Sequence, residues 1–132
     1  MRYNRLPANL QTLQGMQILV VDSCEDYCYM LTTLLELFDI EVLTAFTAQQ
    51  ALRIFMEWQP DILVSEIDLP YEDGHELIQQ VRNKAGEHGK VVTAIALTDY
   101  GNQNMCDGFD MQFTKPFDLD EFVAEIACLA VC

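Results

Sequence analysis

Basic residues are scarce in this chain of 132 residues. Seven Lys and Arg stand against 21 Asp and Glu, which gives a formal net charge of −14. Proteins bind nucleic acids through clustered Lys and Arg, so this composition argues strongly against a DNA or RNA partner. It also disfavours an anionic membrane surface, and it favours basic partner surfaces or cations.

Long apolar runs and export signals are missing as well. No run approaches the roughly 20 apolar residues that span a bilayer. The N-terminal stretch MRYNRLPANLQTLQG has neither the apolar core nor the small-residue cleavage site of a signal peptide. The five cysteines are odd in number and form no CxxC pair, which favours free thiols in a reducing compartment. We therefore expect a cytoplasmic protein.

What the sequence does contain is a regular alternation of short apolar runs and amphipathic segments. The apolar runs have the length of strands and cover residues 17–21, 40–46, 62–66, 91–97 and 109–113. Four segments with helical spacing follow four of these runs, and a capping residue opens each of them: Ser23, Thr47, Asp73 and Asp118.

Two connecting segments complete this pattern. The third helix is expected to end before a loop at 84–89, and the polar stretch 98–108 is expected to form at most a short helix.

Nearly continuous apolar strands that alternate with helices predict an α/β fold. The expected architecture is a doubly wound sandwich, in which helices cover both faces of a five-stranded parallel sheet. We expect residues 17–132 to form one domain and residues 1–16 to be an N-terminal arm or linker. Three leucines of the arm, including Leu13, are expected to dock on a neighbouring surface.

Polar side chains lie where the predicted strands end, which is where open parallel sheets form their sites. Asp22 follows the first strand, Glu66 ends the third, Thr98 ends the fourth and Lys115 follows the fifth, while Asp68 lies in the loop after Glu66. Two carboxylates held together need a cation or a proton between them. A hydroxyl and an ammonium aimed at one point are what a phosphoryl group requires.

These motifs resemble the receiver domain of bacterial two-component signalling, the response-regulator family. QILVVDS resembles the family's first strand, PDILVSEIDLPYEDGHELIQQVR its phosphoacceptor strand, loop and third helix, TAIALTDY its fourth strand, and FTKPFDLDEF its lysine segment and last helix. The resemblance covers residue 17 to about residue 130 and implies a flavodoxin-like fold with strand order 2-1-3-4-5. It also implies a cis bond between Lys115 and Pro116, as is usual in the family.

The sequence departs from the family at the positions that carry its chemistry. Glu66 stands where the family has its phosphoacceptor Asp, and Ser23 stands where it has its main magnesium ligand. Gln112, three residues before Lys115, occupies the place of the aromatic switch residue. The segment between Thr98 and Lys115 is shorter than usual by roughly one helical turn, which predicts a shortened or missing fourth helix.

These departures predict a receiver-like domain that is not phosphorylated on aspartate, is not an enzyme, and acts through protein contacts. The partner would be a sensor kinase, an output domain or another signalling protein. We expect no cofactor, apart from a weakened Mg²⁺ site at Asp22, Glu66 and Asp68. Glu66 is expected to pair with Lys115 or to accept a hydrogen bond from Thr98, as a partial mimic of a phosphoryl group.

Three alternatives remain open. The first is a working phosphorelay receiver with an unusual acceptor such as Asp68. The second is a phosphotransfer enzyme of the haloacid dehalogenase type, although DSCED lacks the required Asp-x-Asp. The third is a flavodoxin-like cofactor binder, although the stretch after the first strand has no glycine.

Overall fold

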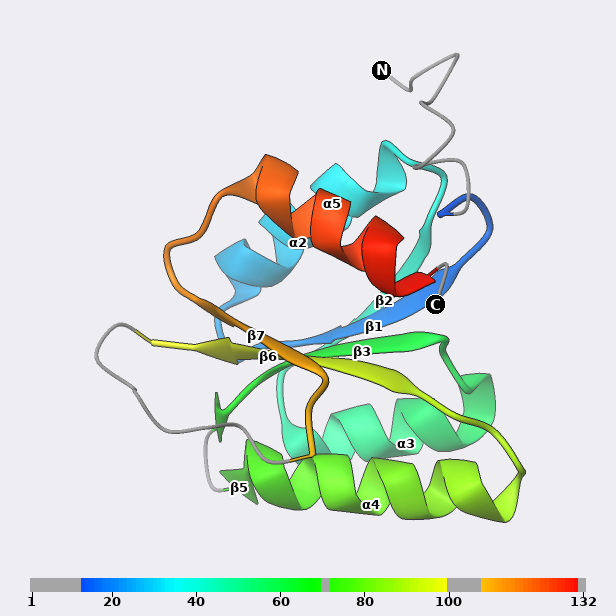
Figure 1. The fold of residues 1–132 in the computed structure, drawn as a ribbon. Helices are drawn as coiled ribbons and strands as arrows, with labels where there is room; N and C mark the ends of the chain where they lie inside the picture. The colour runs from blue at the N-terminus through cyan, green and yellow to red at the C-terminus, as the bar shows by residue number, and fades with distance from the viewer. Residues whose placement is uncertain (1–12, 70–71, 100–107, 131–132) are drawn as a thin grey trace.

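The computed structural model describes residues 13–69, 72–99 and 108–130 (Figure 1). Its main sheet has five parallel strands in the order β2-β1-β3-β6-β7, as the sequence predicted. These strands are β1 (Gln17–Val21), β2 (Glu41–Ala45), β3 (Ile62–Glu66), β6 (Thr93–Thr98) and β7 (Met111–Thr114).

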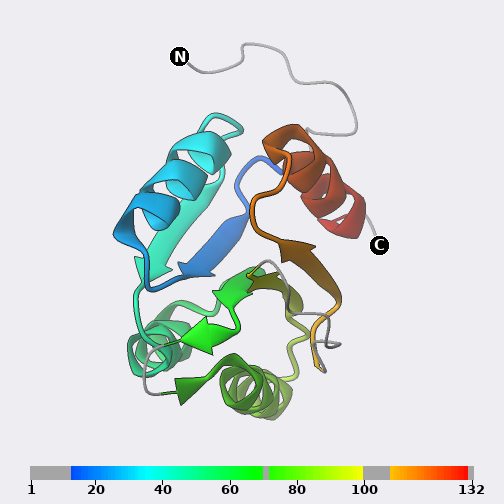
Figure 2. The same cartoon turned by 90° about the vertical axis from the view of Figure 1, so that its left-hand side faces the viewer.

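Four helices lie in two layers, one on each face of this sheet. Figures 1 and 2 show α2 and α5 on one face and α3 and α4 on the other. Their bounds are α2 (Glu25–Glu36), α3 (Ala48–Trp58), α4 (Gly74–Glu87) and α5 (Leu119–Ala130). Among the described residues, none of the helices has the length and apolar character to cross a membrane.

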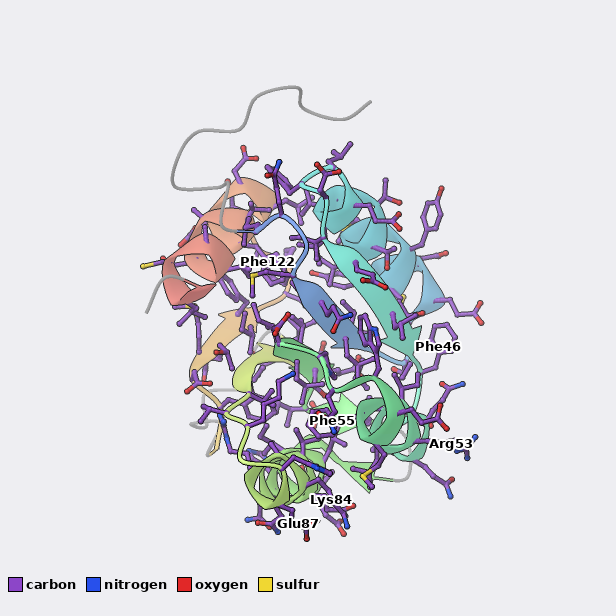
Figure 3. The ribbon with its side chains drawn as sticks, turned by 90° about the vertical axis from the view of Figure 1, so that its right-hand side faces the viewer. Phe46, Arg53, Phe55, Lys84, Glu87 and Phe122 are labelled. Atoms are coloured by element: carbon purple, nitrogen blue, oxygen red, sulfur yellow. The ribbon has the colours of Figure 1, made fainter. Side chains whose placement is uncertain are left out.

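Two apolar cores fill the space between the sheet and its helices. Side chains alternate across a strand, so Ile18 and Val20 of β1 belong to the core under α2 and α5, while Leu19 and Val21 belong to the core under α3 and α4. Phe122 and Phe55 are the largest fully buried side chains of the two cores, and they lie on opposite faces of the sheet (Figure 3). Each such buried side chain contributes about 2–3 kcal/mol.

The predicted caps of α3, α4 and α5 are confirmed. Thr47 Oγ1 accepts from the Gln50 N–H at 3.1 Å, and Asp73 Oδ1 accepts from the His75 N–H at 2.9 Å. Asp118 Oδ1 accepts from the Glu121 N–H at 3.0 Å. Each of these bonds satisfies a helix N–H that has no partner within its own helix.

Ser23 was wrongly predicted as the cap of α2. The helix begins at Glu25, its N-cap residue is Cys24, and no side chain caps it there. Ser23 lies one residue before this N-cap, and its hydroxyl donates to the carboxylate of Glu66 across the sheet, a hydrogen bond that the charge of the acceptor strengthens.

The end of the third helix was also predicted wrongly. α4 continues to Glu87, through most of the loop expected at 84–89. Ala85 is buried in the second core, so packing outweighs the roughly 1 kcal/mol that Gly86 costs inside a helix. The chain leaves the helix at Gly89, whose φ of 67° favours glycine.

A small hairpin follows β3 and was not predicted. β4 (Asp68–Leu69) pairs antiparallel with β5 (Glu72–Asp73). Gly74 then brings the start of α4 against the end of β3, and its N–H donates to the Ile67 carbonyl at 2.9 Å. A Cβ on Gly74 would lie 2.8 Å from the Glu66 carbonyl oxygen, so no other residue fits there without movement of the backbone.

Leu13, assigned to the N-terminal arm, belongs to the packed domain. It is fully buried in the core under α2 and α5, and the Gly15 N–H next to it donates to the Asp39 carbonyl. The expected docking of this leucine is therefore within the domain itself. The boundary at residue 17 stays a prediction, and the expected shortening of the fourth helix falls on residues 100–107, outside the described residues.

Candidate functional site

The polar residues predicted from the strand ends are brought to one edge of the sheet. Figure 2 turns this edge, the left-hand side of Figure 1, toward the viewer. β3 lies between β1 and β6, with Val21 opposite Ser65 and Glu66 opposite Leu97. β7 follows on the outside, with Thr98 opposite Thr114. The residues that end these strands or come directly after them are therefore spatial neighbours.

Lys115 joins the two acids of the site. Its Nζ lies 2.5 Å from Asp22 Oδ2 and 3.4 Å from Glu66 Oε2. The Lys115 side chain is 16% exposed, the Asp22 side chain 0% and the Glu66 side chain 11%. The ion pair is thus mostly screened from water, and the Asp22 contact is the closer of the two. The bond between Lys115 and Pro116 is cis, as the family resemblance implied.

Ser23 holds the Glu66 carboxylate from the other side. Its Oγ donates to Glu66 Oε1 at 2.9 Å and lies 3.4 Å from Oε2. The longer Glu side chain reaches both Ser23 and Lys115 without any added group. The contact between Glu66 and Lys115 expected from the sequence is confirmed.

Asp22 is fixed by its own backbone surroundings. Its Oδ1 accepts from the Cys24 N–H at 2.9 Å, and its N–H donates to the Ala45 carbonyl. The Cys28 thiol donates to the Asp22 carbonyl oxygen at 3.4 Å. Burial raises the pKa of this thiol to about 11, so Cys28 stays protonated and is a structural donor rather than a nucleophile.

The charges of the pocket do not balance, because two carboxylates face one ammonium. Burial, and then the hydrogen bond and the charge of Asp22, raise the pKa of Glu66 to about 7, against the opposing effects of Ser23 and Lys115. Burial alone would lower the pKa of Lys115, but its contacts with Asp22 and Glu66 outweigh this effect and raise it. The lysine is therefore charged at neutral pH, and Glu66 is the group that titrates there.

Thr98 is buried at the same edge but bonds to β7 rather than to Glu66. Its Oγ1 lies 3.4 Å from the Phe113 carbonyl oxygen and 3.2 Å from Thr114 Oγ1. Gln112 is exposed on β7, and the aromatic ring of this strand belongs to Phe113 instead, which is buried in the core. The coupled Thr and aromatic pair of the family therefore has no counterpart at these two positions.

Asp68, the third acid of the expected metal site, is exposed on β4. Among the residues that the structure describes, no group of three or more His, Cys, Asp or Glu side chains is placed to hold a metal ion. Mg²⁺ requires several oxygen ligands in near-octahedral geometry. Asp22 and Glu66 supply two carboxylates, and both already bind Lys115, so the donor set does not fit this ion well.

Tyr27 was not predicted to belong to the site. Its ring lies under Lys115, with the ring centroid 4.3 Å from Nζ. The rest of the Tyr27 side chain packs against the core under α2 and α5. Its place one helical turn after the Asp22 strand end is the only signal that pointed to the pocket.

Comparisons with known proteins bear on the family and the fold of the chain. The family model described as the response regulator receiver domain matches residues 18–127. A Leptolyngbya boryana protein, named only as an uncharacterized 14.6 kDa protein in the sodA1 3′ region, is 37% identical over 128 residues, which cover 92% of this chain and 96% of that protein.

Other relatives are longer or are known as structures. The probable transcriptional regulator ycf27 of Porphyra purpurea is 32% identical over 120 residues, which cover 86% of this chain but only 46% of that protein. The crystal structure of a putative response regulator from Chloroflexus aurantiacus has a TM-score of 0.81 at 24% identity, over 90% of this chain and 100% of that chain. At this identity the structural likeness concerns the fold.

Proposed function

The chain belongs to the response regulator receiver family of two-component signalling, and we propose that it acts there without aspartyl phosphorylation, through contacts with other signalling proteins. The observation that carries this proposal is the closed set of contacts around Glu66. Its carboxylate, at the place of the acceptor, is bound by the Ser23 hydroxyl and by the Lys115 ammonium.

The position of Glu66 disfavours attack on a phosphodonor. In-line transfer needs the nucleophile, the donor phosphorus and the leaving group to be aligned within fractions of an ångström. The Glu66 side chain is one methylene longer than Asp, and both of its oxygens are already held by donors. An incoming phosphoryl group would have to break the contact between Lys115 and Glu66. Only then could the Lys115 ammonium stabilise the phosphoryl oxygens.

The weak fit of the pocket for Mg²⁺ supports the same proposal. In this site a metal would have to compensate the negative charges of the carboxylates and of the phosphodonor together. Ser23 contributes a neutral hydroxyl where the family has a carboxylate. We therefore propose that any Mg²⁺ binding at Asp22 and Glu66 is weak, that the exposed Asp68 does not complete the site, and that the resting state does not depend on the ion.

The net charge of −14 indicates the kind of partner. A surface rich in Asp and Glu attracts basic surfaces and repels acidic ones. We propose a protein partner with a basic contact surface, such as a sensor kinase, an output domain or another signalling protein. The function would be that of a docking module rather than of an enzyme.

Incubation with acetyl phosphate and Mg²⁺, followed by intact-mass measurement, tests the proposal. We expect no gain of a phosphoryl group in the natural chain. The double variant Ser23→Asp with Glu66→Asp restores the acid pair of the family and should gain one phosphoryl group. This variant is the positive control, because it shows that Thr98 and Lys115 are still able to support the reaction.

A stable gain of one phosphoryl group in the natural chain would overturn the proposal. Loss of that gain in Glu66→Ala would identify Glu66 as the acceptor. Loss in Asp68→Ala would identify the exposed acid of β4 and support a phosphorelay receiver with an unusual acceptor.

A further inference from the structure

Three groups from different parts of the chain enclose the ammonium of Lys115. Asp22 and Glu66 provide carboxylates from the ends of β1 and β3. The third group is the aromatic ring of Tyr27, which α2 places 4.3 Å from Nζ. A cation at this distance from the face of an aromatic ring is attracted by the negative charge of the π system.

The ring of Tyr27 is itself held in place. It contacts the ring of Phe117 edge to face, with centroids 6.0 Å apart and an angle of 69° between the rings. Phe117 packs on Phe113 and Phe122 at centroid distances of 5.1 and 5.2 Å. Edge-to-face pairs of this kind stabilise one ring orientation, so the face that Tyr27 presents to Lys115 is set by the aromatic cluster behind it.

We propose that Tyr27 is a positioning residue that holds the Lys115 ammonium against Asp22, so that the chain's own lysine serves as the cation of the pocket. This inference rests on the proposed function in one respect, since it describes a pocket that carries no phosphoryl group. Lys115 is then kept between the two acids and away from solvent.

Tyr29, two residues further along α2, provides a natural comparison. Its side chain has the same chemistry, but the residue is 75% exposed and lies on the solvent side of the helix. The face of α2 toward the sheet carries Tyr27 with the buried Cys28 and Leu31. If a tyrosine affected Lys115 only by changing the stability of α2, substitutions at Tyr27 and at Tyr29 would have the same effect.

Chemical labelling of lysine in the full chain tests the role of Tyr27. Formaldehyde with cyanoborohydride methylates lysine amines, and peptide mass spectrometry gives a rate for each lysine. Lys84 and Lys90 are the other two lysines of the chain and serve as internal references. In Tyr27→Leu, which keeps an apolar contact with Phe117, we expect the rate at Lys115 to rise about fivefold relative to Lys84, the factor that ~1 kcal/mol of cation–π attraction corresponds to.

Two matched variants separate positioning from packing. Tyr27→Phe retains the ring face and should leave the Lys115 rate within about twofold of the natural chain. Tyr29→Leu should leave it unchanged. An unchanged rate in Tyr27→Leu would overturn the proposal, and so would equal increases at all three lysines, because those would indicate general loosening of the fold.

Failure of this inference can be told apart from failure of the proposed function. A chain that accepts a phosphoryl group, yet whose Lys115 is exposed by Tyr27→Leu, would contradict only the proposed function. A chain that stays unphosphorylated, and in which Tyr27→Leu does not change the labelling rate of Lys115, would contradict only the positioning role.

Discussion

At the scale of single residues, Glu66 is where stability and function conflict. Its carboxylate is held beside Asp22 in a place that is 8% exposed to solvent. One ammonium serves both acids, so the second negative charge is only partly compensated. A carboxylate that is ionised in such surroundings lowers the stability of the folded chain.

Replacement of Glu66 by the neutral Gln, which has nearly the same shape, should show directly how much the buried charge lowers the free energy of unfolding. The pKa of Glu66 is about 7 in the folded chain, above the roughly 4.3 of an unfolded glutamate. The folded state therefore binds the proton more tightly, and stability is lost as the pH rises through 7. We expect Glu66→Gln to exceed the natural chain by only about 1 kcal/mol near pH 5, close to the unfolded pKa, and by about 3 kcal/mol above pH 7.5.

Urea unfolding at several pH values between 5 and 8.5 measures this difference. Glu87→Gln on the exposed side of α4, in the pair with Lys84 (Figure 3), is the control and should stay within about 0.5 kcal/mol of the natural chain at every pH. A difference for Glu66→Gln that does not change with pH would contradict the expectation.

The sequence predicted which residues belong to the site better than it predicted the hydrogen bonds that these residues make. Asp22, Glu66, Thr98 and Lys115 converge because parallel strands end at one edge, and the sequence shows where the strands end. Ser23 was expected to cap α2, but the helix begins one residue too late for that, and the Ser23 hydroxyl donates to the Glu66 carboxylate. Thr98 was a possible donor to Glu66, but its hydroxyl lies against the Phe113 carbonyl. The hydrogen-bond partner of a side chain depends on differences in position of fractions of an ångström. The order of residues in the sequence does not contain this information.

At the scale of elements, the positions of the five main strands were largely predicted, because apolar runs between polar segments leave few other places for them. Two features were not. The short hairpin of β4 and β5 has no apolar alternation of its own, and the last turn of α4 depends on the burial of Ala85 in the second core. Both the hairpin and the last turn of α4 depend on tertiary packing, which cannot be predicted from the local sequence.

The contact between β3 and α4 leads to a prediction about glycine. In Gly74→Ala the new Cβ would approach the carbonyl oxygens of Glu66 and Ile67 to 2.8 and 2.9 Å. The backbone at the end of β3 would have to move, and we expect a loss of about 2–4 kcal/mol in the free energy of unfolding.

Gly86 in the same helix is the matched control. A Cβ there meets nothing within 4 Å, so Gly86→Ala should stabilise the chain by about 0.5–1 kcal/mol. Thermal or urea unfolding compares the two. Equal changes in the free energy of unfolding at the two glycines would show that the close approach between β3 and α4 does not affect stability.

At the scale of the whole molecule, the excess of acidic residues should be visible in the response to salt. A formal net charge of −14 repels itself in the compact state, and this repulsion is screened over roughly 10 Å at 0.1 M salt. We expect the unfolding midpoint at pH 7.5 to rise by roughly 3–5 °C between 20 and 300 mM NaCl, about 1 kcal/mol for a domain of this size.

Repetition of this salt series at pH 5 is the internal control. The sequence pI is about 4.1, so the net charge is smaller there and the rise should shrink. A midpoint that falls with salt at pH 7.5 would mean that attractive ion pairs outweigh the repulsion.

The ion pair of Lys115 with Asp22 also joins residues that are 93 positions apart in the sequence. Asp22 directly follows β1 and Glu66 ends β3, so a ribosome synthesises both acids before it adds their cation. Contacts of such long sequence separation form late, since the entropy of closing the loop opposes them. We therefore expect the pocket to be completed when β7 docks on β6, and protection of the Lys115 amine to appear late in folding.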